Sequence, residues 1–167
     1  MAIEIYDQVV PVMQRMISNM SAILQKAESY AQARKIDPPA LLQARLAPDM
    51  FTFTRQVQIA TDFVKSAPSR LTGVEPPRWE DNEQTFAELQ ARLQRALDYV
   101  GSFKREQFAG AESRAIEFKT PTRTLNFNGK DYLLNFALPN FYFHLTMAYA
   151  ILRHNGLEIG KLDYLGG

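Results

Sequence analysis

The chain has 167 residues, of which 46% are apolar, and this is enough to build one hydrophobic core in a single domain spanning residues 1–167. Its 19 basic and 18 acidic residues nearly balance and are scattered, so the strong positive field typical of nucleic-acid-binding proteins is absent and no nucleic-acid partner is expected. The sequence has no cysteine, which excludes disulfides and thiolate metal ligands and indicates a reducing, cytoplasmic location.

No targeting or membrane-spanning segment is expected. The N-terminal segment carries two acids, Glu4 and Asp7, and no basic residue, unlike a signal peptide. The most apolar stretch runs from Phe136 to Leu152, but it is too short to cross a bilayer and contains Pro139 and His144. We therefore expect a buried helix there and no membrane partner.

The first half of the chain predicts two long helices. Apolar residues at helical spacing predict the first from about Ile5 to Ala33, with Pro11 near its start or bending its first turns. The segment Ile36–Pro39 then interrupts the helical pattern. Pro48 is placed to open a second helix, which should run to about Ala67 and end before Pro68.

A loop at residues 73–82 separates the second helix from the third and holds the only tryptophan, Trp79. The simplest interpretation of Trp79 is a hydrophobic plug against one end of the bundle. Thr85 and Glu88 then form a capping-box pattern, which predicts a third helix from this point to about Phe103.

The apolar period changes between the third and fourth long helices. Residues 115–127 alternate, and Asn128-Gly129 is a strong tight-turn signal, so a small irregular or hairpin insertion is predicted. Pro139 should open a fourth helix that ends near Asn155, before a capping glycine. Four long helices with apolar stripes predict an all-α four-helix bundle, because each stripe has to be covered.

Polar side chains that fall on the expected core face of the second helix are candidate site residues. Gln56 lies near the middle of the apolar arc, and Asp49 lies on the same line of the predicted helix. Gln56 is either a buried amide bonded to a neighbouring helix or a ligand-binding group. Asp49 is either a first-turn acid favoured by the helix dipole or a site residue. The opposite face should be solvated, and it carries Thr54, Arg55, Gln58, Thr61, Asp62 and Lys65.

In the fourth helix, His144 shares a face with Asn140. A lone histidine there is a satisfied core residue, a ligand or a general base, since an imidazole titrates near neutral pH. His154 is rotated about 80° away and is expected only to complement the helix dipole. Because this helix is apolar nearly all round, either the loops and the hairpin wrap it or a second subunit covers part of it, and a homodimer is predicted.

Several segments together carry a family resemblance. Residues 138–144, continuing through 148–156 to 160–161, and residues 46–50 with 55–58, closely resemble a bacterial domain-of-unknown-function family in the DinB/YfiT-like superfamily of proposed metalloenzymes. The resemblance covers nearly the whole chain. It implies an up-down-down-up four-helix bundle, with the small insertion before the last helix, and it also implies a homodimer.

The resemblance also implies a metal site. Many superfamily members bind zinc or nickel through one histidine on the second helix and two on the fourth. His144 matches the second of the latter, whereas the first falls on Asn140. The second-helix ligand falls near Gln56 or Gln58, and the periodicity favours Gln56; Asp49 could add an oxygen ligand if it points inward. Because neutral amides bind these metals poorly, the implied divalent-metal site of His144, Asn140 and Gln56 is altered or lost.

Three functional hypotheses follow. The first is a metal-dependent enzyme, of the kind that includes thiol transferases, hydrolases and isomerases, with His144 as its catalytic ligand or general base. The second is a non-catalytic small-molecule-binding protein in which Asn140, Gln56 and Asp49 orient the ligand. The third is a structural or dimeric interaction protein whose buried polar residues only specify packing. The sequence leaves the three open and identifies neither a substrate nor a metal.

Overall fold

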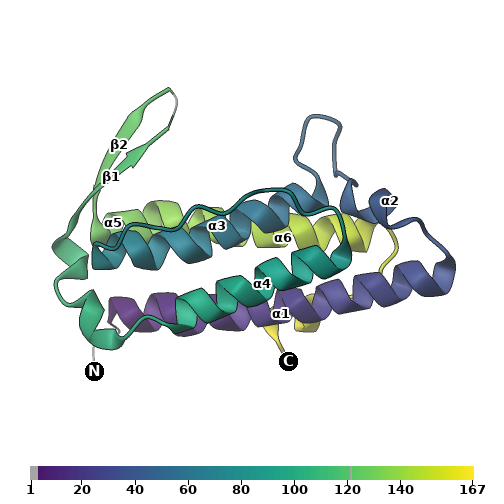
Figure 1. Ribbon diagram of the computed structural model, residues 1–167, viewed down its shortest axis with the longest axis horizontal. Coiled ribbons are helices and arrows are strands. Elements are labelled where there is room, and N and C mark those ends of the chain that lie inside the picture. The colour runs from purple at the N-terminus through teal and green to yellow at the C-terminus, as the bar shows by residue number, and fades with distance from the viewer. Residues whose placement is uncertain (1–3, 121) are drawn as a thin grey trace.

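The computed structural model describes residues 4–120 and 122–167; residues 1–3, part of the segment considered above for targeting, lie outside this range. The protein is predominantly helical. Its four long helices lie along the longest axis (Figure 1) and are α1 (Ile5–Arg34), α3 (Phe53–Thr72), α4 (Phe86–Gly101) and α6 (Leu138–His154). The main pairings are α3 with α6 and α1 with α4, and further contacts between α3 and α4 close the core.

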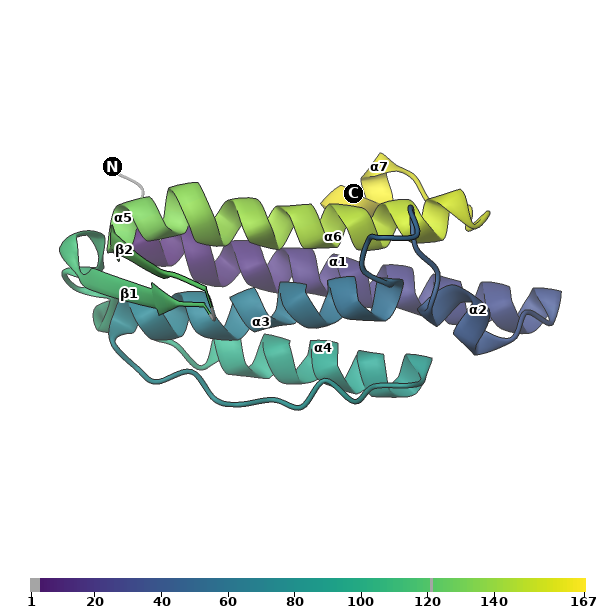
Figure 2. The same ribbon diagram turned by 90° about the horizontal axis from the view of Figure 1, so that it is seen from above.

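The long helices differ in direction, which fixes the path of the loops. Helices α1 and α6 run one way along the long axis, and α3 and α4 run the other way (Figure 2). The connection between α3 and α4 therefore returns along the outside of both helices before α4 begins. This long return places residues of the loop beside the middle of the bundle.

The predicted apolar stripes form the core. Helix α1 spans almost the predicted range and includes Pro11 in its early turns. The capping box is present at the start of α4, where the Thr85 hydroxyl accepts from the Glu88 amide at 3.1 Å and the Glu88 carboxylate accepts from the Thr85 amide at 2.9 Å. The largest core side chains, each less than 2% exposed, include Tyr132, Phe53, Phe141, Met13, Ile17 and Met20.

The predicted bounds of the second long helix were wrong at both ends. Helix α3 begins at Phe53, and its N-cap is Thr52, whose side chain accepts a hydrogen bond from the Arg55 amide at 3.2 Å. Pro48 lies in an exposed turn before the helix. Pro68 lies inside α3 and is buried, so packing of this end of the helix outweighs the hydrogen bond that proline removes.

A hairpin precedes the last long helix, as the alternating pattern predicted. Strands β1 (Ala115–Lys119) and β2 (Thr124–Asn128) pair antiparallel, with Ile116 opposite Phe127. They join at residues 120–123, where the Thr120 amide donates to the Arg123 carbonyl at 2.8 Å. The hairpin and the loop before α3 project on the same side of the layer formed by α3 and α6 (Figure 1).

Asn128-Gly129 is therefore not the hairpin turn that its sequence signalled. Asn128 instead caps the short helix α5 (Gly129–Tyr132), because its side-chain oxygen accepts from the Asp131 amide at 2.8 Å. Gly129 is required by close packing, since a Cβ atom there would lie 1.8 Å from the Ala111 carbonyl oxygen. A turn of π-helix (Leu133–Ala137) joins α5 to α6, so the helical path begins before the predicted Pro139.

The remaining elements are short. They are α2 (Pro38–Leu42), two 3-10 turns (Arg105–Phe108 and Ala111–Ser113) and α7 (Lys161–Leu165), which packs on α1. Among the helices described here, none combines the length and apolar character that crossing a bilayer requires.

Candidate functional site

The closest link between α3 and α6 among the predicted site residues joins Gln56 to His144. The Gln56 Oε1 atom lies 2.7 Å from His144 Nδ1, and these side chains belong to residues only 1% and 8% exposed. Gln56 was interpreted either as a buried amide bonded to a neighbouring helix or as a ligand-binding group. In the structure its amide is hydrogen-bonded to the neighbouring helix α6.

This hydrogen bond fixes the state of the imidazole. An amide oxygen can only accept, so Nδ1 carries the proton and donates it to Gln56. In the neutral ring, Nε2 then keeps its lone pair and is an acceptor or a single ligand.

The surroundings of His144 keep it neutral. Burial lowers its pKa from 6.5 to about 4, and the positive charge of Arg55 adds to the effect. Two rings pack on the imidazole: Phe63 stacks nearly parallel at 6.4 Å between centroids, and Phe143 approaches edge-on at 5.3 Å. A base with so low a pKa is a weak proton acceptor at neutral pH.

The other two predicted site residues do not join this pair. Asn140 is half-buried, and its side-chain nitrogen donates back along its own helix to the Phe136 carbonyl at 2.7 Å. Asp49 lies in an exposed turn before α3, not on the core line of that helix. The inward orientation considered for Asp49 depended on the helix starting at Pro48, which it does not.

These positions do not fit a zinc or nickel site. No group of three His, Cys, Asp or Glu side chains in the described parts of the chain could hold a metal ion. His144 can offer one nitrogen, while the oxygen of Gln56 is engaged with the same imidazole. A stable zinc site requires three or four such ligands, so the donor set is too small.

The face of α3 predicted to be solvated is largely covered. Thr54, Gln58 and Thr61 are each less than 7% exposed, because α2, the returning loop and α4 respectively supply their hydrogen-bonding partners. Gln58, two residues from Gln56, points to the loop, where its side-chain nitrogen donates to Glu83 at 2.8 Å. A two-residue step turns about 200° on a helix, which explains why the two glutamines diverge.

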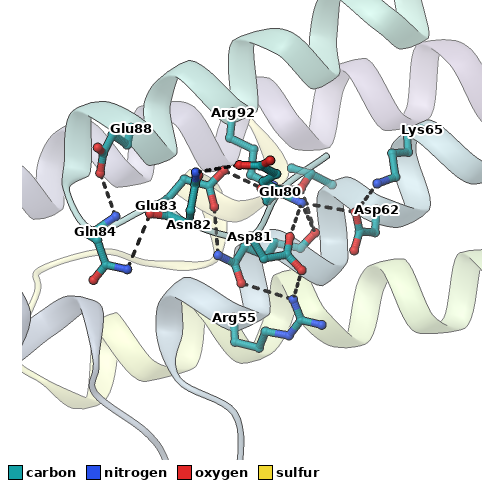
Figure 3. Close-up of polar contacts among 12 residues, drawn as sticks. Arg55, Asp62, Lys65, Glu80, Asp81, Asn82, Glu83, Gln84, Glu88 and Arg92 are labelled. Atoms are coloured by element: carbon teal, nitrogen blue, oxygen red, sulfur yellow. Dashed lines mark hydrogen bonds and ion pairs between the residues drawn. The ribbon is translucent and has the colours of Figure 1, made fainter. Parts of the chain in front are cut away.

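Arg92 of α4 is the centre of this covered face (Figure 3). It is 4% exposed and forms ion pairs with Asp81 at 2.9 Å, Glu83 at 2.9 Å and Asp62 at 3.2 Å. Its Nε atom donates to the Thr61 hydroxyl at 2.7 Å. Arg92 was not among the predicted site residues, because it lies at the edge of the apolar stripe of α4 and its partners come from the distant loop.

Trp79 lies along the side of the bundle and not at its end as predicted. Its ring meets Tyr99 edge-on at 6.1 Å between centroids. The cationic groups of Lys65, Arg92 and Arg95 lie 4.6–5.7 Å from the centre of the same ring. The returning loop explains the difference, because it runs back along the bundle (Figure 2) and Trp79 contacts Lys65 of α3 and Arg95 of α4 instead of the end of α3.

A groove of about 640 Å³ lies between α3, the returning loop and β1. Phe63 lines it and also stacks on His144, so the groove adjoins the buried pair. Phe118 of β1 and Trp79 of the loop provide further aromatic surface. The volume is in the range of small-molecule pockets, which is about 300–1,000 Å³.

A crystal structure of a DinB family member protein from Shewanella denitrificans is similar to this chain, with 43% sequence identity and a TM-score of 0.89 over 97% of this chain and 92% of that chain. The chain is therefore a DinB-like helical protein. Residues 5–165 match the domain of unknown function DUF1993, and the chain belongs to this family. No curated protein matches it.

These matches confirm the resemblance inferred from the sequence, to a domain-of-unknown-function family of the DinB-like group.

Proposed function

We propose that this chain is a small-molecule-binding DinB-like protein whose superfamily metal site is lost. The ligand site lies on the face of α3 that carries Gln56, Ile59 and Phe63, beside His144. The proposal includes the finer expectations from the sequence: a single domain over residues 1–167, an up-down-down-up four-helix bundle, and a bacterial, cytoplasmic protein.

One observation carries the proposal, namely the 2.7 Å bond between His144 and Gln56. It engages the amide that aligns with the superfamily's second-helix ligand and leaves a neutral imidazole acceptor at Nε2. Buried polar groups next to an aromatic groove are the usual means by which a pocket orients a small molecule. The low pKa of His144 favours this role over general-base catalysis.

A thermal-shift screen of metabolites on the purified protein tests the proposal. At least one compound should raise the melting temperature, and His144→Ala should cancel that response while the variant stays folded. His154→Ala is the matched control, because His154 is exposed at the end of α6 and should leave the response intact.

Metal analysis of the natively purified protein distinguishes this proposal from the hypothesis of a metal-dependent enzyme. We expect less than about 0.1 equivalent of any transition metal. About one equivalent of zinc or nickel, lost on His144→Ala, would contradict the proposal and favour a metal-dependent enzyme. If no compound binds and the double change His144→Phe, Gln56→Leu is neutral or stabilising, the purely structural hypothesis is correct.

The homodimer also stays a proposal. Phe143 and Tyr142 of α6 are 52% and 37% exposed, and Leu134 of the preceding π-turn is 41% exposed. Covering these side chains in a second copy would remove apolar surface from water.

A further inference from the structure

The groove beside α3 holds a guanidinium group, that of Arg70, which forms no ion pair with the residues that the structure describes, and we infer that the groove binds a small organic carboxylate through Arg70. This inference rests on the proposed function, because it names the ligand class for the same face of α3. Four observations support it: the state of Arg70, the polar groups beneath it, the aromatic walls and the charges around the groove.

Arg70 is half-buried and lines the groove. Its Cζ atom lies 4.9 Å from the ring centre of Phe118, which covers one side of the guanidinium. Its Nη1 atom is buried, the hydroxyl of Tyr132 lies within hydrogen-bonding reach of the guanidinium, and no carboxylate in the described part of the chain forms an ion pair with it. Arg92 and Arg55, by contrast, are each paired with carboxylates. A half-buried guanidinium without a carboxylate partner would gain a charge-assisted hydrogen bond from an anionic ligand in the groove.

Further hydroxyl donors lie beside Arg70. Tyr132 is completely buried beneath the groove and does not line it, and its hydroxyl lies within hydrogen-bonding reach of Arg70 and Ser66. Burial raises the pKa of this phenol, while Arg70 and Ser66 lie close enough to oppose part of the rise. Ser66 lines the groove together with Arg70. A carboxylate offers two oxygens and about four acceptor positions, which suits a guanidinium flanked by hydroxyls.

The walls of the groove indicate the rest of the ligand. Phe63, Phe118 and Trp79 line a space of about 640 Å³, enough for an apolar or aromatic body. Such a body would contact the ring that stacks on His144.

The charges lining the groove favour a single negative charge. Lys65 is engaged by Asp62 at 2.7 Å, and Asp62 itself lines the groove together with Glu75. These acids would repel a phosphate dianion more than a carboxylate. Arg70 and Arg78 both line the groove and form no ion pair among the described residues, so the groove favours an anion such as a carboxylate.

Trp79 provides the readout, because it is the only tryptophan and lines the groove. Phenylacetate should change its fluorescence saturably, and the neutral phenylacetamide should bind at least about tenfold more weakly, since a charge-assisted hydrogen bond is lost. Arg70→Gln should remove this preference for the acid, and Arg70→Lys should restore part of it. Arg95→Gln is the control, because Arg95 also stacks on Trp79 but lies outside the groove.

The outcomes separate this inference from the proposed function. Equal binding of the acid and the amide, no saturable change, or an Arg70→Gln variant that keeps its preference while remaining folded would overturn the carboxylate site. A compound that stabilises the protein only when His144 is present would still support the proposed function in that case. If phenylacetate binds through Arg70 with unchanged affinity in His144→Ala, the carboxylate site stands and the role proposed for His144 is wrong.

Discussion

At the scale of single residues, the state of His144 decides what the site can do. Its proton is directed to Gln56, and its ring is stacked on Phe63 and met edge-on by Phe143. Burial, together with the nearby charge of Arg55, holds its pKa at about 4. Such an imidazole stays neutral through the physiological range and acts by hydrogen bonding.

The depressed pKa of His144 predicts a pH-dependent stability. The unfolded chain protonates this histidine near pH 6.5, whereas the native protein does so only near pH 4. The contribution of the neutral His144 side chain to the free energy of unfolding is therefore complete above pH 6.5, and it is lost as the pH falls from 6.5 to about 4. The full shift corresponds to about 3 kcal/mol, and solvent screening reduces this to roughly 2 kcal/mol.

Urea unfolding of the wild type and of the double variant His144→Phe, Gln56→Leu across this pH range measures the effect. The variant removes both partners, so no buried amide is left unpaired. As the pH falls from 6.5 to about 4, the unfolding free energy of the wild type should decrease more than that of the variant. A difference independent of pH would mean that His144 titrates normally in the native state.

At the scale of elements, the returning loop between α3 and α4 depends on Arg92. This buried guanidinium joins Asp81 and Glu83 of the loop to Asp62 of α3 (Figure 3). The network holds Trp79 beside α4 and so shapes one wall of the groove.

Replacing Arg92 should release this loop. Arg92→Met removes the cation shared by three carboxylates and leaves Glu83 without an ion-pair partner among the described residues, while Asp62 keeps Lys65 and Asp81 keeps Arg55. We expect a loss of about 3 kcal/mol in unfolding free energy. Trypsin should then cut faster after Arg78 in the loop, which limited proteolysis followed by mass spectrometry would detect. Arg105→Gln is the matched control, because Arg105 pairs with Glu4 and Asp7 on the exposed surface and should matter little. Unchanged stability and cleavage in Arg92→Met would refute this role.

The helices themselves could be predicted from the sequence, because apolar spacing and the Thr85 capping box are local signals that the fold obeys. The errors arose where packing overrides a local signal. Pro68 continues a helix because that end is buried, and Gly129 serves a close approach to another segment instead of a hairpin turn. Boundaries and turns of this kind depend on neighbours distant in the sequence.

The candidate site was predictable only in part. Gln56 and His144 lie on core faces of adjacent helices, so their meeting followed from periodicity and the resemblance. The groove, Arg92 and Arg70 could not be predicted in the same way, because they depend on the path of the returning loop and on the hairpin. Neither path is encoded in a local pattern.

At the scale of the whole molecule, the exposed rings of α6 predict self-association. Sedimentation at micromolar concentration should detect a homodimer, and Phe143→Glu should yield a monomer, because a charge would be buried in the interface. A wild-type protein that is monomeric at these concentrations would contradict the dimer.

The central claim is that His144 is a neutral hydrogen-bonding group and not a metal ligand. Nitrogen-15 NMR of the two ring nitrogens, recorded near neutral pH before and after about one equivalent of zinc chloride, tests it most directly. We predict a neutral ring protonated at Nδ1, with both nitrogen shifts unchanged by zinc. A ring protonated at Nε2, a charged imidazolium, or an Nε2 signal shifted by stoichiometric zinc would contradict the account.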